Sequence, residues 1–244
     1  MTVDFLICGT QKGGTSALDA YCRQHPELLL PAEKELHFFD DESLFSGLEA
    51  DYSHYHQHFP KAVAGKLRGE STPVYMYWPN AAARIQRYNP DMKLIVLLRN
   101  PVERAYSHWQ MESTRGHERL SFSEAIRTED SRLSGGSSDN KRVYSYIDRG
   151  RYQSQLENLW ALFGREQVLV LLSEDLRRVR DEVLASVSEF LGIAPFPGLS
   201  EQTVNSQTYA SPMNPNDRDY LKALFASDIA ALESMLGVDL GHWQ

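Results

Sequence analysis

The sequence predicts a three-layer α/β domain with a central parallel sheet flanked by helices. Three observations support this fold class. Short apolar segments alternate with longer amphipathic segments along the chain, as in βαβ units. The strongest apolar run, "KLIVLLR" at residues 93–99, is unbroken, which is typical of a strand covered on both faces in a parallel sheet. The first apolar run, residues 3–8, leads directly into a glycine-rich turn.

The expected elements follow from apolar patterning and from the positions of proline. Pro26 ends the first helix, and Pro79 and Pro101 each occupy the first turn of a later helix. The expected strands are residues 3–8, a weaker one in "KLRGEST" ending near Glu70, residues 93–99 and residues 167–172. The expected helices are residues 15–25, 79–88, 101 to about 116, 151–163, 176–191 and 217–236.

The length and the pattern predict a single domain over residues 1–244. Residues 131–145 are polar and begin with a run rich in glycine and serine that has no apolar periodicity. Such a stretch between periodic segments is typical of a loop. We therefore expect a mobile loop or lid at residues 131–145.

Composition limits the class of protein. The chain is 42% hydrophobic and 24% charged, which is ordinary for a globular protein, and it has no apolar run of transmembrane length. No signal peptide is visible, so a cytoplasmic location is expected. The formal net charge of −8 argues against nucleic acid as a partner. Cys8 and Cys22 are expected to be free, buried thiols, and neither has metal-ligand spacing, so no metal site is expected.

The stretch "GTQKGGTSAL", residues 9–18, resembles a phosphate-binding loop with one displaced residue. In the pattern G-x-x-x-x-G-K-[ST] the lysine follows the second glycine, but that position is Thr15 here, and the lysine is Lys12. A strand, a glycine-rich turn and a helix N-terminus together favour anion binding through backbone N–H groups. The alternative is a turn whose glycines serve geometry alone and whose lysine is solvated.

A second motif follows the strongest strand. Arg99 stands at the carboxyl end of that strand, where ligands bind in open α/β sheets. Ser107 lies eight residues later, about two turns into the helix that Pro101 begins, so the two side chains could bind a phosphate from two sides. The alternatives are a structural salt bridge for Arg99 and a helix-surface position for Ser107. Arg104 is interpreted as a solvated helix residue.

Together these motifs resemble those of a known enzyme family. "FLICGTQKGGTSAL" is similar to the 5′-phosphosulfate-binding loop of sulfotransferases that use 3′-phosphoadenosine 5′-phosphosulfate (PAPS), and "LLRNPVERAYSHW" to their 3′-phosphate-binding segment. "EKELHFFD", "GESTPVYMY", "RGRYQSQLENLWALF" and "VLVLLSEDL" resemble segments of heparan-type and bacterial natural-product sulfotransferases. The resemblance spans roughly residues 5–191 and is more specific than any single glycine pattern.

The resemblance implies a P-loop-NTPase-like domain that transfers a sulfuryl group from PAPS to a hydroxyl, less often an amine, without a metal. Lys12 would stabilise the leaving phosphate, and Arg99 and Ser107 would select the 3′-phosphate. Tyr152 would lie near the nucleotide, unless it is an aromatic residue packed at a helix start. The nucleotide-binding residues implied are Gln11, Lys12, Gly13, Gly14, Thr15, Ser16, Arg99, Ser107 and Tyr152.

Three residues are candidates for the general base that deprotonates the acceptor. Glu70 and the pair Glu35 and His37 match catalytic or acceptor-side positions of these relatives, and Asp40 matches a further acidic position. A histidine needs little tuning to act near neutral pH, whereas a glutamate usually needs a raised pKa. The alternative for "ELHFFD" is packing, and the alternative for Glu70 is the capping of a loop.

One region departs from the family pattern. Heparan-type relatives carry a basic loop before the final helix, but residues 205–217 contain no Lys or Arg. A nucleotide lid would then use hydroxyls and backbone amides, or charge from Lys141 and Arg142. The expected acceptor is a small molecule, a lipid or a glycan. Two other hypotheses remain: an ATP-dependent nucleoside or small-molecule kinase, and a non-catalytic nucleotide-binding module.

Overall fold

The architecture is that of a computed structural model, which describes residues 2–47, 50–61, 63–198 and 212–244. Its residues group into two compact units, which are described separately. The first unit comprises Met1–Arg99 and Glu157–Ser206, and the second comprises Asn100–Leu156 and Gln207–Gln244. The organisation of residues 1–244 as one domain stays a prediction.

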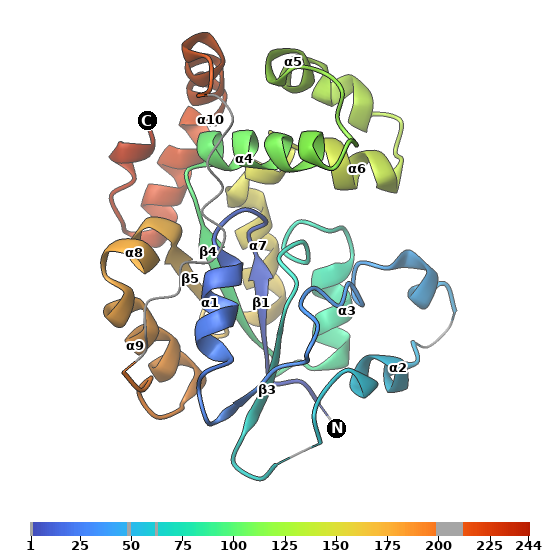
Figure 1. Ribbon diagram of the computed structural model, residues 1–244, viewed down its shortest axis with the longest axis vertical. Helices are drawn as coiled ribbons and strands as arrows, with labels where there is room; N and C mark the ends of the chain where they lie inside the picture. Colours follow the sequence, from blue (N-terminus) through green and yellow to red (C-terminus); the bar gives the residue numbers. More distant parts are fainter. Residues whose placement is uncertain (1, 48–49, 62, 199–211) are drawn as a thin grey trace. The chain divides into compact units, whose positions relative to one another are not determined.

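The first unit contains a five-stranded, fully parallel sheet in the order β2-β3-β1-β4-β5 (Figure 1). Its strands are β1 (Phe5–Gly9), β2 (Leu28–Leu29), β3 (Leu67–Ser71), β4 (Lys93–Leu98) and β5 (Val168–Leu172). Consecutive residues of β4 from Leu94 to Leu98 are all fully buried, so both faces of the sheet are covered. The predicted α/β fold class with a central parallel sheet is confirmed.

Three helices of the first unit pack against the sheet: α1 (Thr15–Cys22), α8 (Ser173–Arg178) and α9 (Arg180–Leu191). Figure 1 shows α1 beside β1, and α8 and α9 contact β5. Leu18, Cys22 and Val187 belong to one buried cluster with Ile95 and Leu97. Each such side chain contributes about 1.5–3 kcal/mol on burial. Cys8 and Cys22 are free and buried as predicted, and burial raises the pKa of the Cys8 thiol to about 12.

The first unit also holds α2 (Tyr52–Gln57), α3 (Ala81–Tyr88) and a 3-10 helix, η1 (Glu42–Phe45). Helix α2 lies in "DYSHYHQHF", and its Tyr55 has no exposed surface. Tyr55 stacks on Phe38 with ring centroids 4.7 Å apart and meets Phe39 edge-on at 5.2 Å. An aromatic core therefore joins α2 to the segment that precedes η1.

The second unit is helical. Its elements are α4 (Pro101–Thr114), α5 (Phe122–Leu133), α6 (Ser138–Tyr144), η2 (Asp148–Gly150), the start of α7 (Tyr152–Phe163), α10 (Pro215–Leu236) and η3 (Gly241–Trp243). Its interior contains charged side chains. Arg104 is fully buried and donates to the carbonyl of Tyr146, so its interpretation as a solvated residue was wrong. Glu129 is 1% exposed and accepts the N–H groups of Ile147 and Asp148, each at 2.7 Å.

Several element boundaries differ from those expected. Helix α1 ends at Cys22, three residues early, and Pro79 lies outside α3, whose N-cap is Asn80. The expected helix 176–191 is two helices, α8 and α9, which meet at Val179.

The segment 131–145 is not one loop, because α5 continues to Leu133 and α6 occupies Ser138–Tyr144. Its mobility stays a prediction. Of the expected nucleotide lid, residues 205–211 lie outside the described residues.

Among the described residues, no helix combines the length and the apolar character needed to cross a membrane. In the same part of the chain, no group of three or more His, Cys, Asp or Glu side chains is arranged to hold a metal ion.

Candidate active site

The glycine-rich loop connects β1 to α1 and follows the sheet edge closely. The N–H of Thr10 donates to the carbonyl of Leu97 in β4 at 3.1 Å, and the N–H of Gly13 donates back to Thr10 at 2.8 Å. A Cβ atom at Gly13 would lie 2.4 Å from the Leu97 carbonyl oxygen, so only glycine fits there. The strand–turn–helix context that the motif requires is present.

The N-terminus of α1 has the properties of an anion-binding site. Its N-cap residue is Gly14, with φ 96°, and no side chain among the described residues caps the helix. Gly14 is exposed, while Thr15 is buried and Ser16 half-buried at the first turn. Uncapped N–H groups and the helix dipole favour negative charge at this point.

Arg99 joins the second motif to the first. It directly follows β4, and its guanidinium donates to the main-chain carbonyl of Lys12 at 3.0 Å. Arg99 therefore holds the loop at the residue that carries the displaced lysine. An arginine has five N–H groups, so one guanidinium can bond both a carbonyl and an anion.

The segment 35–40 presents a histidine between two carboxylates. The His37 Nδ1 atom lies 3.0 Å from the Asp40 Oδ2 atom, and its Nε2 atom lies 3.8 Å from the Glu35 Oε2 atom. The Asp40 side chain has no exposed surface, whereas the side chains of His37 and Glu35 are 46% and 39% exposed. With Nδ1 as the donor to buried Asp40, the Nε2 atom of a neutral imidazole is the acceptor.

Four described residues other than glycine have a positive φ angle: Lys12 (68°), Glu35 (62°), His37 (54°) and Asn80 (66°). Three of them are predicted catalytic residues. Left-handed backbone at non-glycine residues costs about 1–3 kcal/mol and is concentrated at functional sites. The fourth, Asn80, is the N-cap of α3, and Glu70 is not among the four.

Glu70, the third candidate base, has a different environment. It lies in β3, has no exposed surface, and receives hydrogen bonds from the hydroxyls of Thr72 (2.8 Å), Tyr75 (2.9 Å) and Tyr55 (3.0 Å). Burial raises the pKa of Glu70, and these hydrogen bonds act in the opposite direction. Of the three candidates, only Glu35 and His37 reach the surface.

Two adjacent residues after β3, Tyr75 and Met76, contact the segment 35–40 and the glycine-rich loop respectively. The Tyr75 hydroxyl accepts the N–H of Phe38 at 3.0 Å, which fixes the segment that carries His37. The next residue, Met76, donates its N–H to the carbonyl of Cys8 at 2.9 Å, and its sulfur lies 3.7 Å from the Thr10 hydroxyl. The glycine-rich loop and the segment 35–40 therefore border one short stretch of chain.

Ser107 and Tyr152 belong to the second unit. Ser107 is 4% exposed within α4, which begins at Pro101 behind an Asn100 cap. Tyr152 is fully buried at the start of α7, and its N–H donates to Asp228 at 3.0 Å. Ser107 is thus not a helix-surface residue, and Tyr152 packs within its unit.

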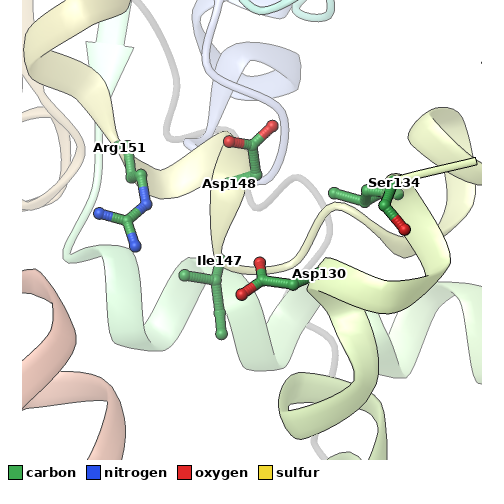
Figure 2. Close-up of a pocket in the computed structure, with 6 residues that line it drawn as sticks. Asp130, Ser134, Ile147, Asp148 and Arg151 are labelled. Carbon is green, nitrogen blue, oxygen red and sulfur yellow. The ribbon is translucent and has the colours of Figure 1, made fainter. Parts of the chain in front are cut away.

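The second unit contains a cavity of about 290 Å³. Figure 2 shows side chains of α5 on one side of it and side chains of the stretch from Ile147 to Arg151 on the other. Its lining residues are Asp130, Leu133, Ser134, Ile147, Asp148 and Arg151. None of the predicted catalytic or nucleotide-binding residues is among them.

Sequence reasoning missed the tyrosines around Glu70. Tyr75 lies in "GESTPVYMY" and Tyr55 in "DYSHYHQHF", both quoted for other reasons. Their spacing along the chain gives no sign that both hydroxyls meet one carboxylate oxygen. The density of aromatic residues was the one available signal, and it fitted a solvated helix equally well.

Comparison with known proteins identifies the family. A family profile described as a sulfotransferase domain matches residues 2–221. The chain belongs to the sulfotransferase family. A crystal structure of a sulfotransferase from Alicyclobacillus acidocaldarius is 31% identical, has a TM-score of 0.85, and is matched over 100% of this chain and 99% of that one.

Two further relatives extend the comparison. Heparan sulfate glucosamine 3-O-sulfotransferase 3B1 of Mus musculus is 34% identical over 188 residues, which are 77% of this sulfotransferase and 45% of the relative. A mouse sulfotransferase solved in complex with PAP shares the fold, with a TM-score of 0.50 and 19% identity over 79% of this chain and 60% of that one. This sulfotransferase spans about half or less of the length of the curated relatives it matches.

Proposed function

We propose that this sulfotransferase takes its sulfuryl group from PAPS and transfers it to a hydroxyl group of a small molecule, lipid or glycan. The uncapped N-terminus of α1 after the close turn at Gly13 supports the assignment of this loop to the 5′-phosphosulfate. A fold neighbour that binds PAP, the product PAPS leaves after transfer, is consistent with that donor.

Lys12 is proposed to stabilise the leaving group. Charge develops on the oxygen that bridges sulfur and the 5′-phosphate as that bond breaks, and a cation held there stabilises the transition state more than the ground state. The loop around Lys12 is held by Arg99 and by β4, which supports a fixed position for the residue. Arg99, Ser107 and Tyr152 are proposed to bind the 3′-phosphate side of the nucleotide, with Gln11, Thr15 and Ser16 at the 5′ side.

His37 is proposed as the general base, oriented by Asp40 and adjacent to Glu35. Its Nε2 atom takes the proton of the acceptor hydroxyl as the acceptor oxygen attacks sulfur, and the bond to the 5′-phosphate breaks to release PAP. The 3.0 Å contact between His37 and fully buried Asp40 is the observation that carries this assignment. Asp40 holds one ring nitrogen and leaves the other for the acceptor.

The acceptor is proposed to be neutral or cationic. Residues 32–59, which include Glu35 and His37, contain seven acidic side chains and one lysine, so they carry a formal charge of −6 out of −8 for the chain. Lys34 pairs with Glu35 at 2.6 Å, and the side chain of Glu33 is 79% exposed. Asp40 is buried and Glu42 pairs with Arg84, so the repulsion of a polyanionic acceptor would come from the other carboxylates of this segment.

A thermal-shift experiment tests the donor. PAP, ATP and ADP are each added with Mg²⁺ and with EDTA, because a ligand stabilises the fold according to its concentration over its Kd, by about 2.7 kcal/mol at 100 times Kd. Stabilisation by PAP in both conditions, with little effect of ADP, is expected. Stabilisation by ATP with Mg²⁺ alone would favour a kinase and sink the proposal.

A further inference from the structure

We infer that Glu70 and Tyr75 are positioning residues that hold the main chain directly after His37, and that Glu70 is not itself the base. The inference rests on the proposed role of His37. It gives a role to a buried carboxylate that the sequence alone placed among the candidate bases, and to a tyrosine that no motif identified.

Two hydrogen bonds in series link Glu70 to the residue that follows His37. The N–H of Phe38 donates to the Tyr75 hydroxyl at 3.0 Å, and that hydroxyl donates to Glu70 at 2.9 Å. One carboxylate therefore restrains, through one hydroxyl, the peptide group directly after His37. This restraint acts where the backbone of His37 has its positive φ of 54°.

The site requires an acceptor-only group. An ionised carboxylate only accepts hydrogen bonds, and Glu70 receives them from the hydroxyls of Thr72, Tyr75 and Tyr55. In Glu70→Gln, the side-chain NH₂ group would face hydroxyl groups that themselves donate hydrogen bonds to residue 70. The Tyr75 oxygen already accepts from Phe38, so reversing its bond to residue 70 would disturb the segment 35–40.

The same set of partners argues against proton transfer by Glu70. A general base must come within hydrogen-bond reach of the proton that it removes. Glu70 has no exposed surface and its lone pairs are engaged, whereas His37 is half-exposed. The acceptor proton therefore goes to His37, and Glu70 keeps its hydrogen bonds unchanged through the reaction.

Two tyrosines provide a matched pair for the test. Tyr75 and Tyr55 are both fully buried, and both donate to the same Glu70 oxygen, at 2.9 and 3.0 Å. Only Tyr75 also bonds the main chain of the segment 35–40 among the described residues. Tyr75→Phe and Tyr55→Phe each delete one hydroxyl and keep the ring. Both variants should lower the melting temperature to a similar extent. A difference between them at His37 or Phe38 therefore cannot result from a loss of stability alone.

The decisive measurements do not require turnover. The ¹⁵N resonances of the His37 imidazole, assigned with a His37→Gln variant, report its tautomer and order, and amide hydrogen exchange reports the Phe38 N–H. Tyr75→Phe should change the His37 signals and speed the exchange of Phe38 by about 10-fold or more, while Tyr55→Phe leaves both as in the wild type. If both variants behave alike, or Tyr75→Phe changes neither signal, the inference fails.

Glu70→Gln completes the test. It should alter the His37 signals and lower turnover by about 10- to 100-fold, the scale of misplacing a reacting group, without changing stabilisation by PAP. Loss of turnover with wild-type His37 signals would mean that Glu70 acts on the acceptor, and would overturn the inference. Failure of PAP to stabilise any form, with the His37 signals shifting as expected, would instead count against the proposed function.

Discussion

Lys12, Glu35 and His37 have left-handed backbone conformations that lysine, glutamate and histidine rarely adopt. Hydrogen bonds to neighbouring segments hold the backbone in these conformations. Arg99 donates to the carbonyl of Lys12, and the N–H of Glu35 donates to the carbonyl of Ser71 at 3.1 Å. Strain of this kind is retained where a side chain must point in one direction. The energetic cost therefore falls on the residues proposed to carry the chemistry.

Replacing Lys12 tests its proposed role at the leaving group. Lys12→Ala should lower turnover at least ~100-fold, the scale of losing one key transition-state donor. Lys12→Gly should lose as much turnover while being more stable than Lys12→Ala by about 1 kcal/mol, because glycine adopts φ 68° freely. Steady-state kinetics and thermal unfolding measure the two effects.

Lys66→Ala is the matched control for the loss of one lysine. Lys66 is exposed directly before β3, at the opposite end of that strand from Glu70 and Ser71. Its replacement should leave turnover unchanged. Turnover of Lys12→Ala within a few-fold of the wild type would contradict the assignment of Lys12.

At the residue scale, the sequence predicted those site residues whose role depends on local pattern. Glycine spacing and the helix start located Lys12, Gly13 and Gly14, because a turn is made by consecutive residues. It could not rank Glu70 against His37, since their difference lies in burial and in hydrogen bonds from Tyr55 and Tyr75. Arg104 was misjudged for the same reason: its partner, the Tyr146 carbonyl, lies 42 residues away.

At the element scale, the predicted strands were confirmed. Strands β1, β4 and β5 are short apolar runs buried in a parallel sheet, whereas β3 has the mixed sequence LRGES and was the weaker expectation. Helix ends were less predictable. No glycine or proline marks the break between α8 and α9 at Val179, and α6 forms in a polar stretch where Ser137 caps its first turn. The two-residue strand β2 was missed because Leu28–Leu29 is too short to show any periodicity.

Helix α5 should make stability depend on pH through Glu129. Burial raises the pKa of Glu129 from 4.5 to about 7, although the N–H groups of Asp148 and Ile147 act in the opposite direction. Between these values the folded chain retains a proton that the unfolded chain has lost, so the contribution of Glu129 to stability falls as pH rises. The melting temperature of the wild type minus that of Glu129→Gln should decline from about pH 5 to about pH 7 and then level off.

Glu124→Gln, on the same helix, is the control. Hydrogen bonds from Ser121 lower the pKa of Glu124, so its pH dependence has the opposite sign, and its difference from the wild type should not decline over this range. A difference for Glu129→Gln that stays constant or rises between pH 5 and 7 would show that the carboxyl is not held in its neutral form.

On the scale of the whole molecule, charge is unevenly distributed along the chain. The segment 32–59 carries most of the net negative charge, and the rest of the sequence is close to balance. Fields from clustered charges act over roughly a Debye length, about 10 Å at 0.1 M salt. The charge of the acceptor should therefore affect its binding even where no carboxylate touches it.

Three oligosaccharides on one sugar backbone test this expectation: a glucosamine oligomer, its N-acetylated form and a heparin-type oligomer. With PAP bound, the cationic oligomer should bind at least ~10-fold more tightly than the anionic one, and the gap should shrink at 1 M salt. Titration calorimetry gives the Kd values. Tighter binding of the heparin-type oligomer would contradict the proposed acceptor class.

Glu33→Gln should reduce this preference, because Glu33 is the most exposed of the acidic side chains in the ion pairs of this segment. Glu189→Gln is the matched control. Glu189 is exposed on α9, which packs on β5 at the far edge of the sheet from β2 and β3. Its replacement removes the same charge from the molecule and should leave the preference intact.

The adjacency of Tyr75 and Met76 has a consequence for how this enzyme can change over evolution or by engineering. Inserting or deleting a residue between Glu70 and Met76 would displace both the glycine-rich loop and the His37 segment, so variation in length is not tolerated there. In the described part of residues 43–66, Tyr55 packs on Phe38 and Phe39 and donates to Glu70. An exchange of that stretch for one of another length or charge must therefore keep this tyrosine in place.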